Sequence, residues 1–178
     1  MNHSKIPVRY AKALIAGAEE QGILDRIRND MENLLSVLKS VPDLSEMLAS
    51  PIISPSKKLE VLTSIFEGKV HPLTISFFRL VVENNREEHL GGMARMYISF
   101  YKQTKGIKVA TLKTAAPVNK ENRDKLADMI RKIFKAEIEL KEETDKDLIG
   151  GFILQVEDQQ LDASVSGQLN QIKRKLHT

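Results

Sequence analysis

Hydrophobic residues in the first part of the chain recur at intervals of three and four, the spacing that lines one face of an α-helix. Prolines and glycines divide this pattern into segments. Pro7, Pro55 and Pro72 stand where a first helical turn tolerates a missing amide, and Gly22 and Gly68 stand where a helix can end. The pattern predicts six helices with short connections, at about 7–21, 24–41, 43–49, 55–66, 72–83 and 86–103. Such a set forms an up-and-down bundle.

The hydrophobic period changes from helical to alternating near Gly106. Alternation predicts strands at about 107–115, 137–141 and 152–156, with a helix over 119–134 between the first two that Asn119 can cap. Leu161 then opens a short return strand. The predicted fold class is α+β: an N-terminal six-helix bundle over 1–105, followed by a small C-terminal α+β domain over 106–178 with a sheet covered by helices.

The stretch from Asp145 to Leu169 organises the second domain. Gly150 and Gly151 precede Phe152, and paired glycines permit a positive φ or a close approach of another backbone. Asp162 or Ser164 can cap a helix that begins near Val165. The apolar positions of that helix follow at intervals of four, three and four: Val165, Leu169, Ile172 and Leu176.

The first and fifth predicted helices carry unusual surfaces. One face of the first helix is marked by Ile6, Tyr10, Ala13, Leu14 and Gly17, and its neighbouring face is mostly small, with Ala11, Ala16 and Ala18. Apolar residues on the fifth helix cover more of its circumference than one core-facing stripe requires. Tight packing inside the bundle explains both features, and so does a groove that docks a partner helix.

Composition and motifs indicate no catalytic, metal or cofactor site. The 178 residues include no cysteine, which removes thiol nucleophiles, thiolate zinc sites and disulfides. No glycine-rich phosphate loop occurs, and the four histidines are not arranged as zinc ligands. Asp145, Asp147 and Gly150 are spaced as in a calcium loop, but Val156 stands where that loop requires glutamate. We therefore expect a protein that is not an enzyme and that binds no cofactor.

Charge gives little support to nucleic-acid binding. The formal net charge is only +3, although the sequence pI is about 9.0. A sheet that recognises RNA displays aromatic side chains, and the predicted strands carry only Phe152. An RNA-associated helical regulatory protein stays as the alternative hypothesis, supported by the pI alone.

Three motifs resemble those of one known family. The letters DLIGGF, at 147–152, and DxxLDASVSGQLxxI, at 158–172, closely resemble the C-terminal signature of the delta subunit of F-type ATP synthase, the family of the oligomycin sensitivity-conferring protein. The segments 9–14 and 83–86 resemble the family's opening helix and a central landmark. Gly91 and Gly92 depart from the bulkier residues that the family leads us to expect.

The resemblance implies a structural stator subunit that resists rotary torque during proton-driven ATP synthesis. It implies that the first domain grips N-terminal helices of alpha subunits and that the second meets the C-terminal region of the b-subunit stalk. The implied location is peripheral, on the cytoplasmic face of a bacterial inner membrane. The residues implied in the alpha-subunit groove are Tyr10, Ala13, Leu14, Phe78, Val81, Val82 and Arg86. Those implied as structural signature are Gly150, Gly151, Phe152, Asp162, Ser164 and Leu169.

Overall fold

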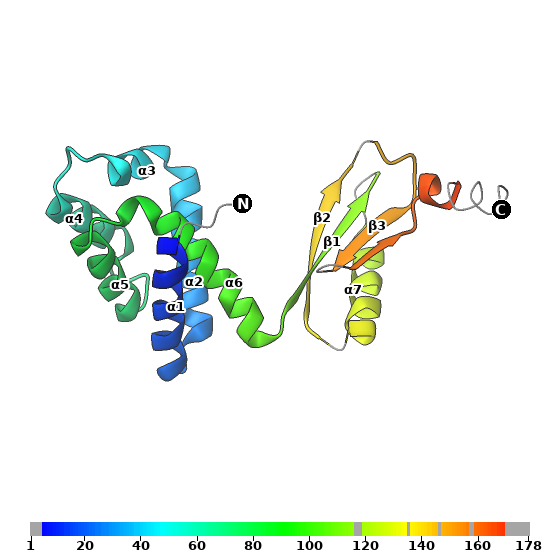
Figure 1. The fold of residues 1–178 in the computed structure, drawn as a ribbon, viewed down its shortest axis with the longest axis horizontal. Helices are drawn as coiled ribbons and strands as arrows, with labels where there is room; N and C mark the ends of the chain where they lie inside the picture. The colour runs from blue at the N-terminus through cyan, green and yellow to red at the C-terminus, as the bar shows by residue number, and fades with distance from the viewer. Residues whose placement is uncertain (1–4, 116–118, 135, 146, 157–158, 170–178) are drawn as a thin grey trace. The chain divides into compact units, whose positions relative to one another are not determined.

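The computed structural model divides the chain into two compact units, Met1–Lys102 and Gln103–Thr178 (Figure 1). The structure describes residues 5–115, 119–134, 136–145, 147–156 and 159–169. The first unit is helical and the second is a mixed sheet with a helix, so the predicted α+β fold class is confirmed.

The helical unit contains the helices that the sequence pattern predicts. They are α1 (Lys5–Glu20), α2 (Leu24–Ser40), α3 (Pro42–Ala49), α4 (Pro55–Phe66), α5 (Pro72–Glu83) and α6 (Leu90–Lys105), with a short 3-10 helix η1 (Glu87–His89). Pro42, Pro55 and Pro72 each stand in a first turn. The sixth helix begins at Leu90 and not at Arg86, because Glu87–His89 form the tighter 3-10 turn.

The first helix packs two residues of its small face, Ala11 and Ala18, inside the bundle, as tight packing predicts. Its other buried residues are Pro7 and Leu14, and Leu14 is the one residue of the face marked by Tyr10 and Ala13 that is buried. Pro7 approaches α6 closely: a Cβ added at Gly92 would stand 3.1 Å from its Cγ. Small side chains allow this close helix packing, so Ala11 and Ala18 lie inside and the larger Tyr10 lies at the edge.

Buried polar groups tie the helices together. The Asp30 carboxylate on α2, which is 1% exposed, accepts hydrogen bonds from the His71 amide at 2.8 Å and from the Thr74 hydroxyl at 2.7 Å. It therefore caps the first turn of α5 from another helix. The Tyr97 hydroxyl donates to the Leu24 carbonyl at 3.1 Å, and burial raises the pKa of this tyrosine.

The second unit is a four-stranded sheet in the order β2-β1-β3-β4 with α7 (Lys120–Phe134) on one face (Figure 1). The strands are β1 (Lys108–Thr114), β2 (Ile138–Thr144), β3 (Phe152–Val156) and β4 (Gln159–Asp162). β1 pairs with β2 in parallel and with β3 antiparallel, and β3 pairs antiparallel with β4. The core between the sheet and α7 is apolar: Ala110, Leu112, Ile130, Ile138, Leu154 and Val156.

The return strand starts earlier than predicted. Gln159 pairs with Val156 and Leu161 pairs with Leu154, so β4 begins at Gln159 and not at Leu161. The cross-strand register determines this boundary, because polar residues can pair on an exposed edge strand as well as apolar ones. The Asn119 carboxamide accepts a hydrogen bond from the Asn122 amide at 2.8 Å and caps α7, as predicted.

Candidate functional site

The α1 and α5 helices lie side by side along one strip of the helical unit. The rings of Tyr10 and Phe77 meet edge to face with centroids 6.5 Å apart, and a Cβ added at Gly17 would lie 4.0 Å from Leu73. Ala13 falls between Tyr10 and Gly17 on the same face of α1, and Leu80 continues the face of α5 that carries Leu73 and Phe77. We call these residues the α1–α5 strip: Tyr10, Ala13, Gly17, Leu73, Phe77 and Leu80.

The seven residues implied in the alpha-subunit groove are distributed between this strip and the core. Leu14, Phe78, Val81 and Val82 are buried, with exposures of 4%, 1%, 0% and 2%. Tyr10 is partly buried, and Ala13 and Arg86 are exposed. The four buried side chains pack inside the unit, where they support α1 and α5 from behind.

Leu80 is an exposed apolar residue that the sequence reasoning missed. It is 46% exposed, whereas its neighbours Val81 and Val82 are buried. The pattern contained a signal for it, because apolar residues around most of α5 must leave some of them outside the core. The strip therefore presents an apolar surface on α5 beside the small residues of α1.

A buried ion pair joins α4 to the 3-10 turn. The Lys58 ammonium lies 2.6 Å from one Glu87 carboxylate oxygen and donates to the Leu48 carbonyl at 2.8 Å. The two side chains are only 5% and 7% exposed. The second Glu87 oxygen is buried and has no hydrogen-bond partner within the described ranges. The ion pair is thus buried, and one oxygen of its carboxylate lacks a hydrogen bond within the described residues.

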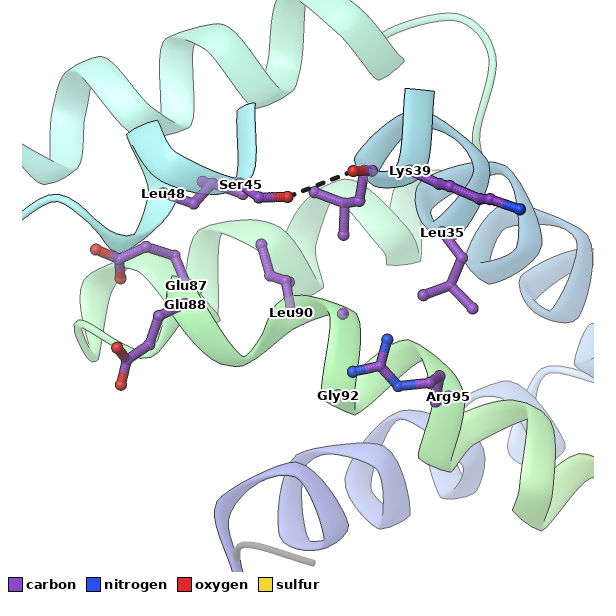
Figure 2. Close-up of a pocket in the computed structure, with 11 residues that line it drawn as sticks. Leu35, Lys39, Ser45, Leu48, Glu87, Glu88, Leu90, Gly92 and Arg95 are labelled. Carbon is purple, nitrogen blue, oxygen red and sulfur yellow. Dashed lines mark hydrogen bonds between the residues drawn. The ribbon is translucent and has the colours of Figure 1, made fainter. Parts of the chain in front are cut away.

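A cavity of about 500 Å³ lies between the end of α2, α3 and the start of α6 (Figure 2). We call it the α2–α6 cavity. Its lining residues are Leu35, Leu38, Lys39, Ser45, Leu48, Glu87, Glu88, Leu90, Gly91, Gly92 and Arg95. Leucines form its middle, and charged side chains lie toward its ends.

The signature residues of the second unit form a backbone junction. Gly151 has a φ of +79°, and a Cβ there would stand 2.3 Å from the Ala163 carbonyl oxygen. The two segments are joined by hydrogen bonds from the Ala163 amide to the Phe152 carbonyl at 2.9 Å and from the Val165 amide to the Gly150 carbonyl at 3.0 Å. Glycine at 151 is therefore required by both conformation and space.

The Asp162–Ser164 segment starts the last described helix, which spans 165–169. The Ser164 hydroxyl accepts from the Gly167 amide at 3.0 Å and donates to the Asp162 carboxylate at 2.6 Å. The hydrogen bonds that the Ser164 hydroxyl and the Ser164 amide donate to this carboxylate lower the pKa of Asp162. A Cβ added at Gly167 would stand 2.6 Å from the Asp162 Oδ2 atom, too close for any residue other than glycine. Ser164 is thus the helix cap, held by Asp162.

The apolar face predicted for this last helix is only partly described. Val165 and Leu169 are exposed, and Ile172 and Leu176 lie outside the described residues. Exposed apolar side chains also lie on α7, where Met129 and Ile133 are 59% and 68% exposed. They stand four residues apart, so they share one side of the helix.

The described residues hold no group of three or more histidines and acidic side chains placed to bind a metal ion. Within the same part of the chain, no helix has the length and apolar character needed to cross a membrane.

Comparison with known proteins identifies the family. The family model of the ATP synthase delta (OSCP) subunit matches residues 6–176. The chain is 36% identical over 176 residues to ATP synthase subunit delta of Cytophaga hutchinsonii, covering 98% of this chain and 96% of that protein. It is 34% identical over 172 residues to ATP synthase subunit delta of Bacteroides thetaiotaomicron, covering 96% and 92%.

A solved structure shows the same fold across both units. A chain in the cryo-EM structure of the Toxoplasma gondii mitochondrial ATP synthase hexamer superposes with a TM-score of 0.75 at 26% sequence identity, covering 97% of each chain. The chain therefore belongs to the ATP synthase delta (OSCP) subunit family, and it is a stator subunit of an F-type ATP synthase.

Proposed function

We propose that the chain joins the catalytic head of the synthase to its peripheral stalk through two separate surfaces, one on each unit. The helical unit grips N-terminal helices of alpha subunits, and the α+β unit binds the C-terminal region of the b subunit. The observation that carries this proposal is family membership over nearly the whole chain. It favours a stator over the RNA-associated regulator that the basic pI left open.

The proposed role is mechanical. The chain resists torque so that the catalytic head does not turn with the rotor, which requires affinity and stiffness and no reactive side chain. We propose accordingly that it is a non-catalytic subunit. Its proposed location is the cytoplasmic face of a bacterial inner membrane, where it is held by its partners in the complex.

The α1–α5 strip is the proposed site for the alpha-subunit helix. An amphipathic helix docks by laying apolar residues into an apolar groove, and small residues on the groove wall let it approach closely. The strip offers exposed Leu80 and partly buried Leu73 on one side, and Ala13 and Gly17 on the other, while Phe77 is buried behind them. Exposed Arg86 lies just beyond the end of α5, where it can contact polar groups of the docked helix.

Ala13→Glu combined with Leu80→Glu should weaken binding of a peptide from the alpha-subunit N-terminus. Both residues are exposed, so charges there disturb docking without entering the core. We expect at least a tenfold weaker Kd, about 1.4 kcal/mol, by calorimetry. Replacing Leu14 or Val81 instead would test folding, because both are buried.

Ile52→Glu is the matched control for this experiment. Ile52 is 92% exposed in the loop between α3 and α4 and lies outside the strip. The Ile52→Glu variant should bind the peptide with the same affinity as the unchanged chain. If the double variant also bound normally while its circular dichroism stayed helical, the strip would not be the docking site.

We propose that the exposed side of α7 forms part of the contact with the stalk. Met129 and Ile133 place two large apolar side chains one turn apart on the surface, next to partly buried Leu126. An exposed pair of this kind suits one face of a partner helix. Leu126 packs against the core cluster and so holds α7 on the sheet.

Met129→Glu combined with Ile133→Glu should weaken binding to a soluble C-terminal fragment of the b subunit by at least about tenfold. Affinity for the alpha-subunit peptide should stay unchanged, because that site belongs to the other unit. Surface plasmon resonance with both partners measures the two effects on one preparation. Equal loss of both affinities would mean that the variant has a general folding defect, and no loss of either would exclude α7 from the stalk contact.

A further inference from the structure

The middle of the α2–α6 cavity is an apolar floor contributed by three elements. Leu48 from α3 and Leu90 from the start of α6 are almost fully buried, and Leu35 and Leu38 from α2 are partly buried. Figure 2 shows Leu35 and Leu90 on opposite sides of the opening. Partly exposed leucines around a concave surface favour binding of an apolar chain, because the contact removes apolar surface of both from water.

One end of the cavity is cationic. The Arg95 guanidinium lies back along α6 over Gly91, with Nη1 3.7 Å from the position that a Cβ on Gly91 would take. Leu38 Cδ1 lies 3.5 Å from the same point, so the missing side chain leaves a space bordered by a leucine and a guanidinium. Lys39 lies on the same rim. Neither Arg95 nor Lys39 has an ion-pair partner among the described residues.

The acidic side chains lie at the other end. In Figure 2, Glu87 and Glu88 stand beside Leu48, away from Arg95 and Lys39. Glu87 is neutralised by Lys58 at 2.6 Å, and Glu88 lies 3.2 Å from the His89 ring. An anion is therefore attracted to the Arg95 end and repelled from the Glu88 end.

We propose that the α2–α6 cavity binds a small amphiphilic anion, a carboxylate carried on an unbranched apolar chain. The carboxylate pairs with the Arg95 guanidinium, which suits the planar two-oxygen geometry, and Lys39 adds a second positive charge. The chain covers the leucine floor toward Leu48. A volume of about 500 Å³ lies in the range of small-molecule sites. The site is independent of the proposed partner contacts, because it uses neither the α1–α5 strip nor α7.

Decanoate is the probe, titrated into the full chain by calorimetry and by amide chemical shifts. We expect saturable binding, with the largest shifts at the Gly91 and Gly92 amides. Decanol, which has the same chain without the charge, should bind at least tenfold more weakly, since it cannot form the charge-assisted hydrogen bonds to Arg95. Equal binding of decanol, or shifts centred elsewhere, would overturn the assignment.

Two variants separate the contribution of the Arg95 charge from that of the open space beside Gly91. Arg95→Gln should weaken decanoate about tenfold and leave decanol unchanged. Gly91→Leu fills the space in front of Leu38 and should abolish binding of both probes. Arg79→Gln, an exposed arginine on α5 outside the cavity, is the control and should bind decanoate normally. If Gly91→Leu does not fold, the Arg95→Gln result decides: unchanged decanoate affinity in that variant would refute the site.

Discussion

Gly151→Ala should strongly destabilise the second unit while leaving the stability of the first unchanged. A Cβ at 151 would stand 2.3 Å from the Ala163 carbonyl oxygen and 2.9 Å from the Ser164 Cα, and both are backbone atoms that cannot rotate away. The φ of +79° adds strain for any residue with a side chain. Separating the segments also breaks the hydrogen bonds that join 150–152 to 163–165. We expect a loss of about 3 kcal/mol or more, a large part of the stability of a small unit.

The two units can be followed separately in this experiment. The chain has no tryptophan, and its three tyrosines, Tyr10, Tyr97 and Tyr101, all lie in the first unit. Tyrosine fluorescence should keep its urea midpoint in Gly151→Ala, whereas far-ultraviolet circular dichroism should lose the sheet contribution at lower urea.

Gly106→Ala is the matched control. Gly106 has a similar φ of +68°, but no atom lies within 4 Å of an added Cβ. This variant should cost only about 1–2 kcal/mol, the price of a left-handed conformation alone. If the two variants were equally destabilised, the close approach at Ala163 would not be the reason for glycine at 151.

Lys58→Met should destabilise the first unit by about 3–5 kcal/mol, because it leaves the Glu87 carboxylate buried without a counter-charge. One oxygen of that carboxylate already lacks a partner among the described residues, so no local donor replaces the ammonium. Urea unfolding followed by tyrosine fluorescence measures the loss. Lys57→Met, the exposed neighbour, should stay within about 0.5 kcal/mol of the unchanged chain.

The double variant Lys58→Met with Glu87→Leu tests the cause. If the cost of the single change is the uncompensated charge, removing both charges should restore most of the stability. A double variant as unstable as Lys58→Met would show instead that the hydrogen bond to the Leu48 carbonyl carries the effect.

Helix and strand positions in this chain follow from local chemistry. Pro55 and Pro72 fix first turns, and Ser54 accepts from the Lys57 amide at 3.4 Å at the start of α4. Asn119 and Ser164 cap the helices after them, as the sequence predicts. These features depend on residues within one helical turn, so they can be read without knowing the tertiary structure.

Features that depend on distant neighbours could not be read in this way. Asp30 looks like an ordinary exposed acid on an amphipathic helix, yet it caps α5 from 41 residues away in sequence. The Lys58–Glu87 pair joins residues 29 positions apart. The choice between the two explanations for the small face of α1 also depended on the fold, since which alanines lie inside is determined by the helices that pack against them. Burial of Phe78, Val81 and Val82 likewise became visible only with the fold.

The signature of the second unit illustrates both cases. The glycine pair and the capping serine were recognisable, but the requirement for Gly167 was not. It arises because the Asp162 carboxylate, held by Ser164, occupies the space of a Cβ on that residue. The signature residues therefore form one junction between the sheet and the following helix, and this structural role explains the glycines, the aspartate and the serine in it.

In the proposed function this chain carries force between the head and the stalk. Membrane vesicles from a strain lacking the subunit provide the direct measurement: proton-driven ATP synthesis before and after addition of the purified chain. We expect the full chain to restore synthesis, and the Ala13→Glu, Leu80→Glu variant to fail although it folds. If synthesis proceeded equally well without the chain, the chain would not be needed to carry force. If the strip variant restored synthesis in full, the α1–α5 strip would not be the contact that carries it.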